Sequence, residues 1–267
     1  MTAGDVDSPS FLARLHSRRL GRNFEYLPSC ASTNDEIAAR ALAGCAEGLL
    51  VVAGEQIGGR GRRGRVWHSP AGENLYFSML LRPALPAALA APVTLLAGTA
   101  LAASLSALGF APQLKWPNDV LLDGGGGPRK VAGILTEMAS EASRVRYVIL
   151  GVGINVNAQE FPDDLADRAT SLRLVRGQRV DRGDVLAAFI HAFEPIYDDF
   201  VAHGPSAALS EWHRYATLGQ VCWVDREGGR IEGVAEGVDE LGALLVKTAA
   251  GDSVSVHAGE VNWLSSR

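Results

Sequence analysis

Apolar positions along the chain fall into two kinds of pattern. Leu49 to Gly54 is a short continuous apolar run and Asn74 to Leu81 alternates, so both predict strands. Val93 to Leu108 is a longer run of small residues that Gly109 closes, which predicts a buried helix. The same reasoning predicts strands at 23–27, 114–116, 120–122, 130–138 and 146–156, a loop at 158–172, and helices at 9–20, 37–43 (after the capping residues 32–36), 182–200 and 206–215.

The pattern changes after Gly219. From there the chain predicts five short strands separated by glycine and aspartate turns, at 221–224, 230–235, 243–248, 253–256 and 261–264. Five short strands in so short a segment indicate a small barrel. We therefore place a domain boundary near Leu218, which divides the chain into an N-terminal arm (1–21), a main domain (22–218) and a C-terminal barrel (219–267).

Composition narrows the class of protein. Hydrophobic residues make up 47% of the 267 residues, enough to bury a core, and the net charge of -5 argues against general nucleic-acid binding. The three cysteines show no metal-binding spacing and predict free thiols in a reducing cytosol. Met1 to Ser10 lacks the apolar core of a secretory signal. Pro83 to Leu108 is interrupted by prolines, so we expect a buried helix and its lead-in rather than a membrane span.

Gly58 to Trp67 packs four arginines between glycines and ends on a tryptophan. Arginine can grip phosphate or carboxylate through two donors, and glycine lets backbone N–H groups approach an anion. The segment therefore predicts a mobile loop that closes over a nucleotide phosphate, with Trp67 as a face for a base. Taken alone, the same composition also suits a solvated loop or a sequence-tolerant nucleic-acid contact.

Two further motifs combine cations with turn-forming and polar residues. Lys115 to Asp119 (Lys-Trp-Pro-Asn-Asp) offers an amide that could pair with an adenine edge and a carboxylate that could act as a general base. Lys130 stands just before a buried strand, where it can present a fixed cation to phosphate or carboxylate. Either lysine alone is more often a solvated surface residue, so the motifs must be interpreted together.

In chain order, these motifs resemble those of biotin–protein ligases, also called biotin–[acetyl-CoA-carboxylase] ligases. The resemblance covers roughly Phe24 to Arg267, and the arginine loop together with Lys-Trp-Pro-Asn-Asp makes it specific. The matching segments are Ser32-Thr33-Asn34, Glu55-Gln56 with the arginine loop, Lys115 to Asp119, Arg129-Lys130 with Ala132 to Leu135, and Gly151 to Asn157.

The resemblance implies a fold and an activity. The fold is α+β, with a mixed sheet flanked by helices, like that of class II aminoacyl-tRNA synthetases, followed by a small SH3-like β-barrel. The activity joins biotin to ATP, giving biotinyl-5′-AMP and pyrophosphate, and then transfers biotin to one lysine of a biotin carboxyl carrier domain of acetyl-CoA carboxylase or a related carboxylase. Mg²⁺ is expected to enter the site with the ATP, and no cluster of protein ligands is expected to hold it. We expect a cytoplasmic enzyme with no membrane partner; relatives include monomers and homodimers.

The resemblance also implies roles for single residues. It assigns biotin binding to Ser32, Thr33, Asn34, Gln56, Gly59, Arg60, Gly133 and Leu135. It assigns the nucleotide to Arg62, Arg63, Trp67, Asn118, Lys130 and Asn155. The expected catalytic residues are Lys130, which contacts the reacting carboxylate and α-phosphate, Arg62, which faces the phosphate, and Asp119, which helps to deprotonate the acceptor lysine.

Departures from the family's pattern set the remaining expectations. Some relatives carry an N-terminal DNA-binding domain, whereas few residues precede Asn23 here, so we expect neither DNA binding nor repressor activity. The glycine run at 124–127 looks like an insertion that bulges into solvent. Two alternatives stay open: a lipoate or octanoate ligase of the same broad fold, which the arginine loop disfavours, and a nucleic-acid-binding module, which the acidic charge disfavours.

Overall fold

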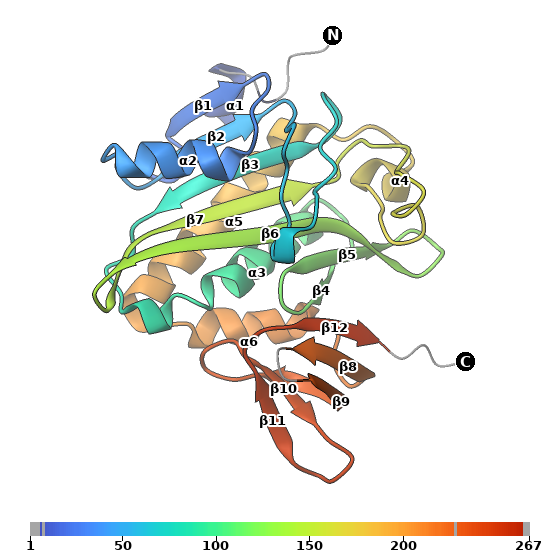
Figure 1. Cartoon of the computed structure of the whole chain (residues 1–267). Coiled ribbons are helices and arrows are strands. Elements are labelled where there is room, and N and C mark those ends of the chain that lie inside the picture. The colour runs from blue at the N-terminus through green and yellow to red at the C-terminus, as the bar shows by residue number, and fades with distance from the viewer. Residues whose placement is uncertain (1–5, 7–8, 227–228, 264–267) are drawn as a thin grey trace.

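The computed structural model describes residue 6 and residues 9–226 and 229–263, which form two β-sheets with helices packed on the larger one (Figure 1). The larger sheet has the order β1-β2-β3-β7-β6-β5-β4; β1 and β2 are parallel and the other neighbours are antiparallel. Its strands are β1 (Asn23–Leu27), β2 (Leu49–Ala53), β3 (Leu75–Leu81), β4 (Gln113–Lys115), β5 (Asp119–Asp123), β6 (Pro128–Glu141) and β7 (Arg144–Ile154). This mixed sheet with its helices confirms the predicted α+β class.

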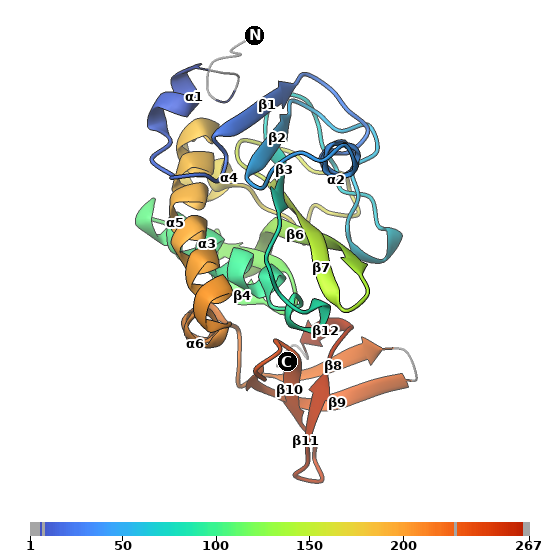
Figure 2. The same cartoon turned by 90° about the vertical axis from the view of Figure 1, so that its left-hand side faces the viewer.

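Helices cover the two faces of this sheet unequally, as the side view in Figure 2 shows. One face is covered by α3 (Val93–Ala107) and α5 (Arg182–His203), with α6 (Ser206–Tyr215) against both and α1 (Pro9–Arg14) against α5. On the other face lies α2 (Thr33–Leu42), which contacts β2, β3 and β7. The rest of that face is therefore available for a ligand.

Strand alternation separates the two faces. Phe77, Leu150 and Val152 point into the large core beneath α3 and α5. Tyr147 and Ile149, on the opposite face of β7, pack beneath α2. The same alternation along β7 places Gly151 and Gly153 on the open face, where neither residue carries a side chain beyond hydrogen.

The smaller sheet follows in sequence and has the order β11-β10-β9-β8-β12. It is antiparallel and consists of β8 (Val221–Arg226), β9 (Gly229–Val238), β10 (Leu244–Lys247), β11 (Ser253–Val256) and β12 (Glu260–Trp263). Hydrogen bonds join it and its lead-in to the main sheet: Trp116 Nε1, between β4 and β5, donates to the Gly242 carbonyl at 3.0 Å, and Thr217 N donates to the Leu114 carbonyl at 2.9 Å. The division into three domains at 21 and 218 stays a prediction.

Two expectations about helices were wrong. The helix predicted at 9–20 ends at Arg14, because the Glu194 carboxylate accepts the backbone N–H groups of Arg18, Arg19 and Leu20 in place of helical carbonyls. The pattern also missed α4 (Leu172–Arg176), which Ser171 caps by accepting from Leu174 N. Residues 1–5 and 7–8 of the predicted arm, and Leu264 of the last predicted strand, lie outside the described residues.

The apolar segment that raised the question of a membrane span is a core element. Ala87–Ala107 is long and apolar enough by composition to cross a bilayer, but 72% of its apolar window is buried within the fold. Cys30, Cys45 and Cys222 are free thiols, as predicted. The glycine run forms the exposed turn between β5 and β6, where Asp123 Oδ1 accepts from Gly125 N at 2.7 Å and Gly127 N at 3.1 Å.

Candidate active site

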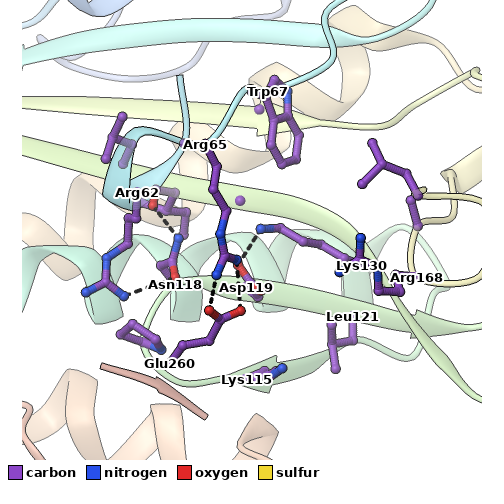
Figure 3. A pocket seen from close by; sticks show the side chains of 18 of the residues that line it. Arg62, Arg65, Trp67, Lys115, Asn118, Asp119, Leu121, Lys130, Arg168 and Glu260 are labelled. Atoms are coloured by element: carbon purple, nitrogen blue, oxygen red, sulfur yellow. Dashed lines mark hydrogen bonds and ion pairs between the residues drawn. The ribbon is translucent and has the colours of Figure 1, made fainter. Parts of the chain in front are cut away.

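A cavity of ≈ 1160 Å³ lies on the open face, between the main sheet, the arginine loop and the smaller sheet. The arginine loop, which contains the short helix η1 (Arg62–Gly64), crosses in front of β6 in Figure 1 and lines the cavity together with Lys115–Asp119. Figure 3 labels seven charged residues of its lining: Arg62 and Arg65 from the loop, Lys115, Asp119 and Lys130 from the sheet, Arg168 from the segment after β7, and Glu260 from β12. Segments that are far apart in the sequence thus meet at one site.

Glycines on β6 and β7 make room for this cavity. Gly133 and Gly153 are direct partners across the two strands, and the Trp67 indole lies over both. A Cβ atom at Gly153 would stand 2.5 Å from that ring, and one at Gly151 would stand 2.2 Å from Asn34 Oδ1. The absence of side chains at these positions therefore permits the close approach of Trp67 and Asn34 to the sheet.

At one end of the cavity, polar side chains are buried and bonded to one another. Gln56 Oε1 accepts from Thr33 N at 2.9 Å and from Thr33 Oγ1 at 3.1 Å, and Ser78 Oγ lies 2.7 Å from Thr33 Oγ1 and 2.6 Å from Asn34 Oδ1. Asn34 Nδ2 in turn donates to Glu137. Such a network fixes the orientation of each amide and hydroxyl, as a polar ligand requires.

Ser32 departs from its expected capping role. It occupies the N-cap position of α2 in an extended conformation, but its side chain makes no capping hydrogen bond. The residue is only 4% exposed and lines the cavity instead. Its hydroxyl therefore belongs to the cavity wall rather than to the helix terminus.

Ion pairs from Arg60 and Arg65 attach the arginine loop to the rest of the molecule. Arg60 forms a two-point pair with Asp35 of α2, at 2.6 and 2.7 Å, which holds the pKa of Asp35 below its ordinary value. Arg65 forms a second two-point pair with Glu260 of β12, and this bond lowers the pKa of Glu260. Arg60 also lies 3.7 Å from Glu137 of β6, so the loop is anchored to α2 and to both sheets, and Arg62 and Arg63 lie between the anchors.

Arg62 is the arginine of the loop that turns most deeply into the protein. Its Nη1 is 3.4 Å from both Asn118 Oδ1 and the Gly259 carbonyl, and burial lowers its pKa. Asn118 also donates through Nδ2 to the Ile134 carbonyl at 2.9 Å, so its amide links the turn at Pro117 to β6. Arg63 is exposed at φ 58°, in the left-handed region.

Lys130 and Asp119 form the ion pair in the middle of the cavity. Lys130 Nζ lies 2.6 Å from Asp119 Oδ1, and the two side chains are 32% and 23% exposed. The same ammonium lies 5.2 Å from the centre of the Trp67 ring, a cation–π distance. Residue 130 is held in place from its other side, because its backbone exchanges hydrogen bonds with Arg168 and Thr170.

Nearly all predicted site residues converge on this cavity. Gly59 does not line it: the residue is buried within the arginine loop, where its carbonyl accepts from Trp67 N at 2.9 Å. Asn155 lines it while its Nδ2 donates to the Thr170 carbonyl. The predicted residues that do line it are Ser32, Thr33, Asn34, Gln56, Arg60, Arg62, Arg63, Trp67, Asn118, Asp119, Lys130, Gly133, Leu135 and Asn155.

Sequence reasoning missed several supporting residues. Arg65 lies within the arginine loop, so the motif contained it, but its partner Glu260 is 195 positions away and belongs to no motif. Ser78 and Glu137 belong to no motif, and a polar residue within a strand gives no sequence signal of its own. Among the residues that the structure describes, no group of three or more histidines, cysteines or carboxylates is placed to hold a metal ion.

Comparison with known families gives two matches along the chain. Residues 26–155 match the Biotin/lipoate A/B protein ligase family, and residues 217–262 match the Biotin protein ligase C terminal domain. The first segment contains the arginine loop, Lys115–Asp119 and Lys130, and the second contains the smaller sheet.

Individual proteins are similar over most of their length. The "Bifunctional ligase/repressor BirA" of Bacillus spizizenii is 39% identical, over 89% of this chain and 73% of the relative. The "Biotin--[acetyl-CoA-carboxylase] ligase" of Paracoccus denitrificans is 36% identical, over 86% of this chain and 96% of the relative. Among solved structures, the biotin protein ligase from Aquifex aeolicus in complex with biotin and ATP superposes with a TM-score of 0.76 at 30% identity, covering 91% of this chain and 99% of the other.

Proposed function

The chain is a biotin protein ligase of the Biotin/lipoate A/B protein ligase family, and on this premise we propose that it activates biotin with ATP as biotinyl-5′-AMP and then transfers biotin to a lysine of a biotin carboxyl carrier domain. One observation carries the proposal. A buried polar network and a cluster of cations share a single cavity, so that a neutral polar ring and a pair of anions can be bound side by side.

The polar network suits the ring system of biotin. Thr33, Asn34 and Gln56 present oriented amide and hydroxyl groups at a buried end of the cavity, which match a ureido group that both donates and accepts hydrogen bonds. Gly133 and Leu135 then provide the sheet surface along which an aliphatic chain can lie toward Lys130. Ser32 and Arg60 complete the wall of this part of the cavity.

The cations suit the first chemical step. A carboxylate oxygen of biotin attacks the α-phosphorus of ATP, a P–O bond forms, and the bond to the bridging oxygen of pyrophosphate breaks. Both reactants are anionic, so Lys130 and Arg62 lower their repulsion and stabilise the charge that builds at phosphorus. Trp67 and Asn155 form the wall that we assign to the adenosine part, with Asn118 beside them.

The second step needs a free amine. The acceptor lysine must lose a proton before its nitrogen attacks the biotinyl carbonyl, forming an amide and releasing AMP. Asp119 is the carboxylate next to Lys130, and we assign to it the acceptance of that proton. The mixed anhydride reacts readily with water, and we assign to the anchored arginine loop the exclusion of solvent from it.

Mg²⁺ enters this proposal with the nucleotide. Mg²⁺ is commonly bound through substrate phosphates and one or two carboxylates. It therefore does not require a cluster of three protein ligands, and the described residues contain no such cluster. We further propose a cytoplasmic enzyme, since all three cysteines are free thiols. Lack of repressor activity stays a prediction, which a mobility-shift assay with biotin-operon DNA at physiological salt would test.

Biotin-dependent exchange between ATP and pyrophosphate tests the proposal. Radiolabelled pyrophosphate should enter ATP when biotin is present, and lipoate or octanoate should not replace biotin. Exchange with lipoate or octanoate alone would assign the chain to the other branch of its family. Failure of all three acids to support exchange would refute the adenylating activity. Transfer to a purified carrier domain, followed by mass spectrometry, then identifies the second step.

A further inference from the structure

Lys115 is a cation of the cavity to which the mechanism above assigns no role. It ends β4, the edge strand of the main sheet, and is the direct cross-strand partner of Asp119 on β5. Its side chain lines the same cavity as Lys130 and Arg62, and Figure 3 shows it beneath the Asp119–Lys130 pair. Lys115 is therefore built into the site rather than placed on the outer surface.

The two carboxylates that act electrostatically on Lys115 are already paired with other cations. Asp119 is bound by Lys130 at 2.6 Å, and Glu260 is held at two points by Arg65. Within the described part of the chain, the Lys115 ammonium makes no hydrogen bond or ion pair. A half-buried ammonium without a partner is unfavourable, so its position in a ligand cavity indicates an anion that arrives from solution.

A second observation points to an acceptor-rich ligand at the same boundary between the sheets. Thr217 and Trp263 line the cavity, as Trp67 does, and Thr217 Oγ1, Trp263 Nε1 and Trp67 Nε1 are all buried without a hydrogen-bond partner. Thr217 is tied to the strand of Lys115, because its backbone N–H donates to the Leu114 carbonyl at 2.9 Å. Unpaired donors beside an unpaired ammonium favour a ligand whose groups only accept hydrogen bonds, as phosphate oxygens do.

We propose that Lys115 binds the β- and γ-phosphates of ATP and, after the first step, the pyrophosphate product, with Thr217 and Trp263 as supporting donors. This inference rests on the proposed function, because it names the part of ATP that this end of the cavity holds. Lys130 and Lys115 then divide the nucleotide between them: Lys130 serves the reacting α-phosphate and Lys115 serves the leaving group. Biotinyl-5′-AMP lacks the two outer phosphates and makes no contact with Lys115.

That division gives a test with opposite expectations for the two half-reactions. Lys115→Gln should raise the KM for ATP and the inhibition constant for pyrophosphate by about 10- to 100-fold, the range for a hydrogen bond to a charged group. Transfer from chemically prepared biotinyl-5′-AMP to the carrier domain should proceed at the wild-type rate. Lys115→Arg, which keeps the charge, should recover most of the loss. Calorimetric titration with tripolyphosphate gives a readout that is independent of turnover.

Lys247→Gln provides the matched control, because Lys247 pairs with Glu236 at 3.5 Å on the smaller sheet and does not line the cavity. Equal losses in both half-reactions of Lys115→Gln would show a structural role and overturn the inference. Unchanged ATP and pyrophosphate constants would overturn it as well. A wild-type chain without biotin-dependent exchange would instead refute the proposed function itself, and the variants would then have no bearing on ATP.

Discussion

The two faces of the main sheet contrast sharply although the same strands build both. On the helix-covered face, Phe77, Leu150 and Val152 fill a core against α3 and α5. On the open face, the intervening positions are Ser78, Gly151 and Gly153. One face contributes apolar burial, and the other contributes space and oriented polar groups.

The difference shows that stability and ligand binding are assigned to alternate residues of one strand. Because successive side chains point to opposite faces, a shift of one residue in register would place core residues in the cavity. Packing of the core residues therefore fixes the register of the strands, and with it the positions of the cavity residues. This separation predicts that substitutions on the two faces affect different measurements.

The largest effect is expected on the core face. Phe77→Ala removes a fully buried ring that lies 5.3 Å from Phe189, and should lower the free energy of unfolding by about 3–5 kcal/mol. The folded fraction should keep its exchange rate, because Phe77 does not line the cavity. Denaturant unfolding followed by circular dichroism measures the first quantity. A normal stability with reduced turnover would contradict the separation of the faces.

On the cavity face, Lys130→Ala should reduce the rate of ATP–pyrophosphate exchange by about 10²–10³, the typical loss for a donor that stabilises transition-state charge. The unfolding midpoint should change little, since Lys130 is 32% exposed. Arg129→Ala is the control. Arg129 is next to Lys130 in the sequence, and its guanidinium donates to the Ala166 carbonyl at 3.3 Å in an exposed position. Near-normal exchange in Lys130→Ala would remove this residue from the mechanism.

A pair of glycine substitutions sharpens the comparison. Gly153→Ala brings a methyl group 2.5 Å from Trp67 and should displace the indole, raising the KM for substrates by about tenfold or more at an overpacking cost of about 1–3 kcal/mol. Gly98→Ala, on the core side in α3, meets its nearest neighbour at 3.6 Å and should be neutral or stabilising. Steady-state kinetics and thermal melting of both variants decide the matter. Similar behaviour of the two would contradict the contrast.

The smallest effect concerns pH. Burial is the main cause that lowers the pKa of Lys115. The carboxylates of Asp119 and Glu260 act in the opposite direction, and the cations Lys130 and Arg65 lower the pKa further, so that it lies below the ordinary value. As pH rises, this ammonium should lose its proton before an ordinary lysine does, and the KM for ATP should then increase. Lys115→Arg keeps its charge and should flatten that rise. A rise of equal size in both enzymes would assign it to another group.

Local sequence signals were sufficient for most elements of the fold. Period-two alternation located β3, and the run of small residues closed by Gly109 located α3, because in both cases one pattern dictates burial. The helix predicted to reach Leu20 was too long, since the competing acceptor, Glu194, lies on α5. A long-range contact of that kind leaves no trace in the local pattern.

The candidate site could be predicted only in part, for a similar reason. Motif residues such as Lys130, Asp119 and Arg62 are recognisable by their neighbours in sequence, and they meet in one cavity. Glu260 became visible only when the structure placed it beside Arg65. Lys115 stood inside a recognised motif, but its lack of a partner is a property of the folded site and cannot be read from spacing.

The arginine loop is anchored to β12 through Arg65 and Glu260, which are 195 positions apart in the sequence. Proteins are synthesised from the N-terminus, so the residues that bind Arg60 leave the ribosome long before the partner of Arg65. A nascent chain can therefore fold its main sheet while one wall of the cavity is still missing. The cavity becomes complete only after β12 has emerged, so catalysis has to wait for the synthesis of the smaller sheet.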